Sequence, residues 1–236
     1  DNKVARDERA EIVVITHAEN MPKDEKACLE VGGDRRNVYH RQIRIISDKK
    51  KLQKRLDAII DKDQHQDYLD EADHWFTIGH ENAHSLGPKK GCEKLGKYRN
   101  IIEENKADMA SLAFVDLLTE LGMYTEEQRK QIIVTVTADN FLKSKPTLSQ
   151  AHRVRTVMQN NYMAKRGAYE IVDGKIHVNI DKVVPAAKEM LAEIIRIQID
   201  EEFDKADKYV KENFVWTDNM ELIGKKLQKV NKANNG

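Results

Sequence analysis

The chain has 236 residues, of which 34% are charged and 40% hydrophobic, and its 40 basic and 40 acidic residues give a net charge of zero. This balance argues against a dedicated binder of nucleic acid or of anionic membranes, because such proteins usually carry a basic excess. No apolar run approaches the length of about 18 residues that a membrane-spanning helix needs, so the composition fits a single globular domain over 1–236.

Short strands and turns are predicted before Asp48. Residues 11–16 (EIVVIT) are a β-branched run, which is typical of a strand. Residues 37–45 alternate partly between polar and apolar side chains, and we expect them to pair with the first strand. The stretch 19–36 is rich in turn-forming residues. From Asp48 onward the apolar residues recur at helical spacing instead.

Two helices joined by a glycine-containing loop follow. The first is predicted over 74–86 and ends before Gly87-Pro88, a pair that breaks helices. A basic loop covers 89–96. The second helix is predicted over 97–121, and Gly122 is placed to cap its carboxyl end.

Two capping boxes predict the starts of two further helices. Thr125–Gln128 and Thr147–Gln150 both place a threonine three residues before a glutamine, so that each side chain can bond the other's backbone N–H. We expect the second of these helices to run to about Lys165.

The remaining sequence predicts a β-hairpin and then helices. Residues 169–172 and 175–179 flank Asp173-Gly174, a dipeptide that favours a tight hairpin turn. Residues 181–230 show the apolar spacing of two or three amphipathic helices. The fold class is therefore mainly α, with a few short β-strands and one β-hairpin.

One motif carries chemistry: His80, Glu81 and His84 form an HExxH pattern. On a helix, residues four apart share a face, so both imidazoles can reach one metal ion. Glu81 lies about 100° around the helix from His80, where it can contact a water molecule on that ion rather than the ion itself. The pattern predicts a zinc site with Glu81 as general base.

A third ligand is expected downstream, because catalytic zinc usually has three protein ligands and one open position. Glu104 lies 20 residues after His84, and Asp108 shares its helix face four residues later. We expect Glu104 to bind the metal and Asp108 to accept the free ring N–H of a histidine. Glu103 could compete as ligand; otherwise it is a histidine partner or a surface residue.

Three stretches, 80–88 (HENAHSLGP), 102–111 (IEENKADMAS) and 150–162 (QAHRVRTVMQNNY), resemble the dipeptidyl peptidase III family of zinc metallopeptidases. The chain is most similar to the branch with a five-residue histidine motif. The resemblance implies a zincin-like helical catalytic lobe that hydrolyses short peptides with one zinc ion. It also implies that His152 stabilises the oxyanion. The sequence departs from the family at Ser85, where glycine is usual, and at Thr156, where the family has an arginine although Arg155 is adjacent.

The resemblance further implies a cleft between two lobes, and this chain is too short to hold the N-terminal lobe. We therefore expect a missing lobe or a partner chain, and the removal of dipeptides does not follow from these residues. Two alternatives stay open. One is a zinc-binding module without peptidase activity, and the other is a helical interaction protein whose HExxH motif arose by chance.

The compartment is left open. Cys28 and Cys92 are too few for a disulfide scaffold in a chain of this length, which slightly favours a reducing compartment such as the cytoplasm. Because the first residue is Asp1 and no apolar leader follows, we expect a processed protein or the C-terminal part of a longer one.

Overall fold

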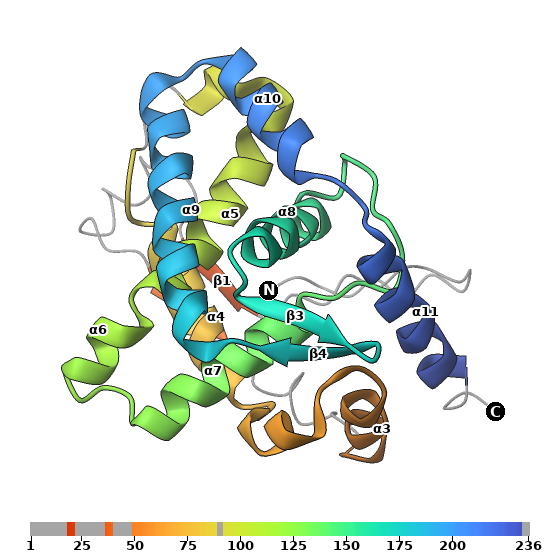
Figure 1. The fold of residues 1–236 in the computed structure, drawn as a ribbon. Helices are drawn as coiled ribbons and strands as arrows, with labels where there is room; N and C mark the ends of the chain where they lie inside the picture. Colours follow the sequence, from red (N-terminus) through yellow and green to blue (C-terminus); the bar gives the residue numbers. More distant parts are fainter. Residues whose placement is uncertain (1–17, 22–35, 40–48, 89–91, 233–236) are drawn as a thin grey trace, which may run out of the picture. The chain divides into compact units, whose positions relative to one another are not determined.

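The computed structural model of the chain describes residues 18–21, 36–39, 49–88 and 92–232 (Figure 1). The chain divides into two compact units, an N-terminal unit (Asp1–Ser47) and a helical unit (Asp48–Gly236). A single catalytic domain over 1–236 stays a prediction. Among the described residues, no helix combines the length and the apolar character needed to cross a membrane.

The N-terminal unit contains a two-stranded antiparallel sheet. Its strands are β1 (Ala18–Met21) and β2 (Arg36–Tyr39), with Ala18 opposite Tyr39. The strand predicted over 37–45 is thus found in its first residues, whereas the strand predicted over 11–16 lies outside the described residues. The prediction of turns over 19–36 is wrong at its start, where the chain forms strand β1. Its sequence, AENM, has no β-branched residue, so only the pairing with β2 identifies it as a strand.

The helical unit is mainly α, which confirms the predicted fold class. Its elements in chain order are α3 (Lys49–Ile59), η1 (Lys62–Asp67), α4 (Ala72–Ala83), η2 (Cys92–Tyr98), α5 (Arg99–Ala113), α6 (Val115–Glu120), α7 (Glu126–Asp139), α8 (Ala151–Lys165), β3 (Tyr169–Val172), β4 (Lys175–Val178), α9 (Ile180–Asp200), α10 (Phe203–Asn213) and α11 (Asp218–Lys232).

Helix α5 is the central element of the helical unit. It packs against α4, α8 and α9, and Figure 1 shows it between α8 and α9. All residues from Asn105 to Ala113 are buried, including Lys106 and Asp108. Burying polar or charged groups costs free energy unless they find partners. The buried polar residues of α5 therefore indicate a functional site inside the helical unit rather than an ordinary hydrophobic core.

A close approach of α4 and α5 is made at Gly79. A Cβ atom there would lie 2.3 Å from the hydroxyl oxygen of Ser111 and 3.1 Å from its Cβ. The Ser111 hydroxyl already donates to the Phe76 carbonyl, at 2.8 Å. The two helices thus touch through backbone and a small side chain directly before the first histidine of the motif.

Replacing Gly79 by alanine should therefore destabilise the protein. Overpacking costs about 1–3 kcal/mol, which exceeds the gain of about 1 kcal/mol that alanine has over glycine in a helix. We expect a lower midpoint of urea unfolding for Gly79→Ala, and partial recovery when Ser111→Ala removes the clashing oxygen. An unchanged midpoint in the single variant would contradict the tight helix contact.

The predicted helix limits around the motif are shifted in the structure. Helix α4 covers Ala72–Ala83 instead of 74–86, because His84 begins a turn that leads to Gly87 with φ +83°. The single helix predicted over 97–121 is divided into η2, α5 and α6. The division between α5 and α6 falls at Phe114, and no sequence breaker marks it.

Several local signals are confirmed. Gly122 has φ +73° and caps α6, with its N–H bonded to Thr119 O and the next N–H bonded to Leu118 O, both at 2.9 Å. The capping box at Thr125 is complete. The β3–β4 hairpin turns through Asp173 and Gly174, which both have positive φ as a type I′ turn requires.

The prediction of a second capping box, at Thr147, is wrong. The Thr147 N–H does bond the Gln150 side chain at 3.1 Å, but the Thr147 hydroxyl pairs with Ser149 rather than with the Gln150 N–H. Residues 147–150 form a turn, and α8 begins only at Ala151.

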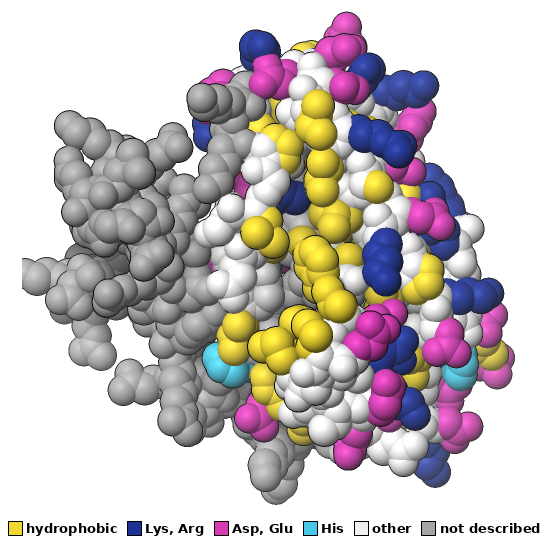
Figure 2. Space-filling view, turned by 90° about the vertical axis from the view of Figure 1, so that its left-hand side faces the viewer, with side chains coloured by type: hydrophobic (Ala, Val, Ile, Leu, Met, Phe, Trp, Pro, Cys, Tyr) yellow, Lys and Arg dark blue, Asp and Glu magenta, His cyan; other side chains and the backbone are white. Residues whose placement is uncertain are grey.

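Exposed apolar side chains gather on α6 and the residues beside it. The exposed fractions of four of them are 42% for Phe114, 45% for Leu117, 66% for Leu121 and 67% for Met123. Figure 2 shows hydrophobic side chains gathered on the face that carries α6 and α9. Because large exposed apolar patches often mark contact surfaces, this face of the helical unit is a candidate contact surface.

Candidate metal centre

The two histidines of the motif meet at the carboxyl end of α4. Their Nε2 atoms lie 3.1 Å apart, and their ring planes are 89° apart. Two nitrogen ligands at about 2.0–2.1 Å from a tetrahedral zinc ion are about 3.3 Å from each other. His80 is buried, and the His84 side chain is 19% exposed. The spacing of these two atoms therefore fits ligation of one ion.

Glu104 reaches the histidine pair from α5. Its Oε2 atom lies 3.5 Å from His80 Nε2, and the ligand atoms of His80, His84 and Glu104 all fall within 4.8 Å of one another. Burial alone would raise the pKa of Glu104, but the hydrogen bond from His152 and the charge of Arg155 lower it. The three residues predicted as ligands thus come together with the carboxylate ionised, as a cluster that can hold a metal ion.

Carboxylates contact the other ring nitrogen of each histidine. Asp108 Oδ1 lies 2.7 Å from His80 Nδ1, and Glu103 Oε1 lies 3.0 Å from His84 Nδ1. An ionised carboxylate can only accept, so each Nδ1 carries a proton, and in the neutral imidazole Nε2 then keeps the lone pair that a metal needs. Of the alternatives left open for Glu103, the structure places it against a histidine.

Asp108 is held ionised although it is almost fully buried. Burial alone would raise its pKa, but the Arg155 guanidinium and His80 lower the pKa to about 2. Arg155 Nη1 lies 2.7 Å from Asp108 Oδ1 and 3.3 Å from Glu104 Oε2. Gln159 donates to Asp108 Oδ2 at 2.9 Å. Helix α8 therefore fixes the carboxylates that α5 presents to α4.

His152 lies at the open edge of this cluster. Its Nδ1 is 3.0 Å from Glu104 Oε2, and its side chain is 70% exposed. Thr156, which takes the family arginine's place in the sequence, is buried and donates to the His152 carbonyl at 3.0 Å. Arg155, the adjacent residue, makes charged contacts with Glu104 and Asp108.

Glu81 is buried beside the cluster, with 8% of its surface exposed. Its charge is among those that raise the pKa of His84, so the carboxylate lies near that imidazole. The role of Glu81 as general base stays a prediction.

Gln159 and Lys106 belong to the site but were not predicted from the sequence. A signal for Gln159 was present: His152, Arg155 and Gln159 are spaced by three and four residues, which puts their side chains on one helix face. Lys106 had no such signal, because a lysine in a helix is usually a solvated surface residue.

Proton competition should make metal binding depend on pH. Burial alone would lower the pKa of His84, but the hydrogen bond to Glu103 and the charge of Glu104 outweigh it and raise the pKa. Since only the neutral imidazole binds metal, zinc affinity should be full above this raised pKa and fall as the pH drops through it. Glu103→Gln should move the fall to lower pH in chelator competition between about pH 5.5 and 8.5. An unmoved profile would contradict the role of Glu103.

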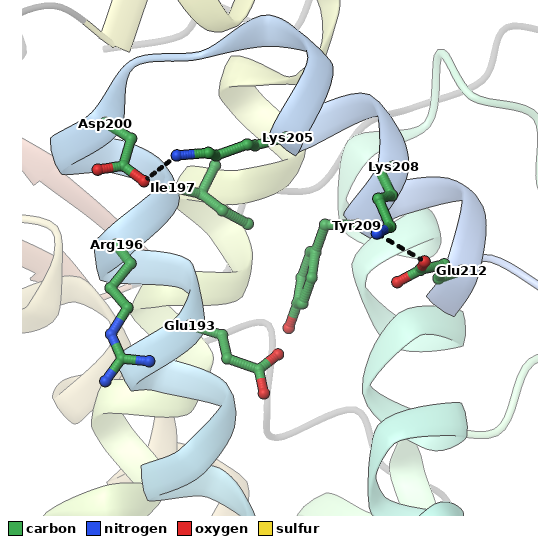
Figure 3. A pocket seen from close by; sticks show the side chains of 8 residues that line it. All are labelled: Glu193, Arg196, Ile197, Asp200, Lys205, Lys208, Tyr209 and Glu212. Atoms are coloured by element: carbon green, nitrogen blue, oxygen red, sulfur yellow. Dashed lines mark hydrogen bonds and ion pairs between the residues drawn. The ribbon is translucent and has the colours of Figure 1, made fainter.

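A separate cleft lies between α9 and α10 (Figure 3), with a volume of about 230 Å³. Lys205 pairs with Asp200 at 2.8 Å, and Lys208 lies 3.9 Å from Glu212. The residues that line it include none of the metal cluster. Charged groups that pair with each other in an open cleft are typical of a solvated surface, and the cleft is not part of the metal centre.

The chain resembles known proteins at the level of the fold. No protein-family model matches the chain. Nudix hydrolase 3 of Arabidopsis thaliana is 27% identical over 199 residues, which are 78% of this chain and 25% of that protein. The chain thus spans only a quarter of the length of that curated relative.

Two solved structures resemble the chain much more extensively. Dipeptidyl peptidase III from Caldithrix abyssi has a TM-score of 0.81 and 25% identity, and the match covers 92% of this chain and 43% of that one. Dipeptidyl peptidase III from Corallococcus sp. strain EGB has a TM-score of 0.77 and 22% identity, over 92% and 41%. The chain therefore has the fold of less than half of a dipeptidyl peptidase III chain. The branch with a five-residue histidine motif stays a prediction.

Proposed function

We propose that this chain is the zinc-binding catalytic lobe of a peptidase of the dipeptidyl peptidase III family. The observation that supports it most is the cluster of His80, His84 and Glu104, whose ligand atoms lie within 4.8 Å of one another. The likeness to solved dipeptidyl peptidase III structures supports a peptidase fold around that cluster.

The chemistry of the donor set suits zinc. Two imidazole nitrogens and one carboxylate oxygen are a common ligand set of catalytic zinc, which keeps a further position open. The carboxylates on both Nδ1 atoms support the tautomer that ligation needs. When bound, zinc would acidify a water molecule and polarise the carbonyl group of the substrate.

Glu81 is proposed as the general base. It would accept a proton from the attacking water as the new C–O bond forms, and it would pass that proton to the amine nitrogen as the C–N bond breaks. The burial of Glu81 supports this role, because a carboxylate shielded from bulk water exchanges its proton with the reacting groups rather than with solvent.

His152 is proposed to stabilise the oxyanion. Its Nδ1 contacts Glu104, and its side chain is 70% exposed, which would allow Nε2 to contact a substrate. In its doubly protonated form the ring can donate from Nε2 to the oxygen on which negative charge develops.

Short peptides are the proposed substrates, and neither nucleic acid nor membrane is proposed as a partner. The solved dipeptidyl peptidase III chains are more than twice as long as the matched region. We propose that a further lobe or a partner chain completes the peptide-binding surface. The alternative is a zinc-binding module of this family that has no peptidase activity.

The test combines metal analysis with peptide hydrolysis. We expect one zinc ion per purified chain by mass spectrometry of the metal, and cleavage of a library of quenched fluorescent peptides. Zinc without cleavage would favour the inactive module. Absence of stoichiometric zinc after incubation with the metal and desalting would contradict both zinc-dependent functions.

A further inference from the structure

The metal centre includes a buried ammonium group that the proposed mechanism does not use. Lys106 lies on α5, and its side chain is only 4% exposed. Its Nζ atom is 2.8 Å from Glu103 Oε1 and donates to the carbonyl of Leu86 at 2.6 Å. A buried lysine is costly unless it is paired and hydrogen-bonded, so these two partners account for its place.

Lys106 and His84 share one oxygen of Glu103. Glu103 Oε1 lies 3.0 Å from His84 Nδ1 as well as 2.8 Å from Lys106 Nζ. The other oxygen, Oε2, accepts a hydrogen bond at 2.9 Å from Gln198, a buried residue of α9. The carboxylate that faces the histidine is thus held by groups from three elements.

The second partner of Lys106 belongs to the turn that follows the motif. Leu86 comes two residues after His84 and one residue before Gly87, whose φ is +83°. A Cβ atom on Gly87 would lie 3.4 Å from Lys106 Cδ, so the turn packs directly against the lysine side chain. Lys106 therefore connects the end of α4 to α5 on the side where His84 is presented.

We propose that Lys106 is a positioning residue of the metal centre: it holds Glu103 against His84 Nδ1, so that His84 Nε2 faces the metal. The pair formed by Arg155 and Asp108 serves His80 in the same way, because Arg155 Nη1 and His80 Nδ1 both lie 2.7 Å from Asp108 Oδ1. Each histidine thus contacts a carboxylate, and that carboxylate in turn pairs with a cation. The inference rests on the proposed metal site at His80, His84 and Glu104.

The first test is the zinc affinity of Lys106→Met, which removes the charge and keeps most of the volume. Loss of the groups behind a metal-binding histidine typically weakens metal binding by about 10–100-fold, and we expect a loss in that range by chelator competition on the folded protein. Lys188→Met, at an exposed position of α9, is the matched control and should bind zinc like the wild type.

A double-mutant cycle separates positioning from general support of the fold. If Lys106 acts through Glu103, then Glu103→Gln with Lys106→Met should bind zinc no more weakly than Glu103→Gln alone. Losses that multiply in the double variant would overturn the proposal. So would wild-type zinc affinity in Lys106→Met accompanied only by a lower Tm, since that is the result of a purely structural role.

Circular dichroism shows whether each variant is folded before zinc is added. Should Lys106→Met fail to fold, Lys106→Gln, which keeps a hydrogen-bond donor without the charge, takes its place in the cycle with the same criteria. A wild type that binds no zinc would overturn both the proposed function and this inference. A wild type that binds zinc and cleaves peptides, with an unaffected Lys106 variant, would overturn the inference alone.

Discussion

Glu81→Gln is expected to retain zinc and to lose peptide hydrolysis. Glutamine has nearly the same shape as glutamate but cannot take a proton from water, and positioned acid–base groups contribute about 10²–10⁴-fold to a rate. His80, His84 and Glu104 are untouched, so the metal content should stay at the wild-type level. The measurements are kcat/KM on a cleavable peptide and zinc per chain in the same preparation.

The control for this substitution is Glu120→Gln, at an exposed position of α6, which should leave hydrolysis unchanged. Wild-type activity in Glu81→Gln would remove Glu81 from the mechanism. If Glu81→Gln instead lost zinc together with activity, the residue would be supporting the metal rather than the proton transfer.

His80→Ala is expected to abolish zinc binding. The substitution removes one of the cluster's ligand atoms and leaves the Nε2 of His84 facing a gap. It also deprives Asp108 of its 2.7 Å partner, although Arg155 still neutralises that carboxylate. Neither zinc binding nor peptide hydrolysis should be detectable.

Thermal unfolding provides an independent measure of the same loss. A ligand that binds only the folded state stabilises it by about 4 kcal/mol at 1,000 times its Kd, so added zinc should raise the Tm of the metal-free wild type. His80→Ala should show no such rise. The control is His177→Ala, which changes a histidine of the β-hairpin that is hydrogen-bonded to Asp61. This variant should keep the zinc-dependent rise in Tm. A zinc-dependent rise in His80→Ala would place the metal elsewhere.

Local patterns predicted the elements whose cause is local. The HExxH spacing, the Thr125 capping box and the Asp173-Gly174 turn each depend on residues within a few positions of one another, and the structure contains all three features. Glu104 could be proposed as a ligand because catalytic zinc needs a third protein ligand and because Asp108 lies on the same helix face four residues later. Its contact with the histidine pair then followed from one interhelical packing.

Features set by distant partners could not be predicted in this way. Strand β1 exists through its pairing with β2. The Thr147 box fails for a local reason instead, because the hydroxyl of Ser149, two residues later, pairs with the threonine hydroxyl. Lys106 is the clearest case. Its burial depends on two residues that lie far from it in sequence. Leu86 offers its carbonyl to the lysine, and Gln198 holds the Glu103 carboxylate with which the lysine pairs.

The close approach at Gly79 and Ser111 has a consequence for how such a site can diverge. Because α4 and α5 are in direct contact, the spacing between His80 and the acids of α5 does not depend on the length of the segment that follows the Leu86–Gly87 turn. Insertions directly after Pro88, beyond the turn that contains His84 and Leu86, should therefore be tolerated without disrupting the metal cluster. Sequence length in that interval can vary during evolution, while any enlargement of Gly79 would be selected against.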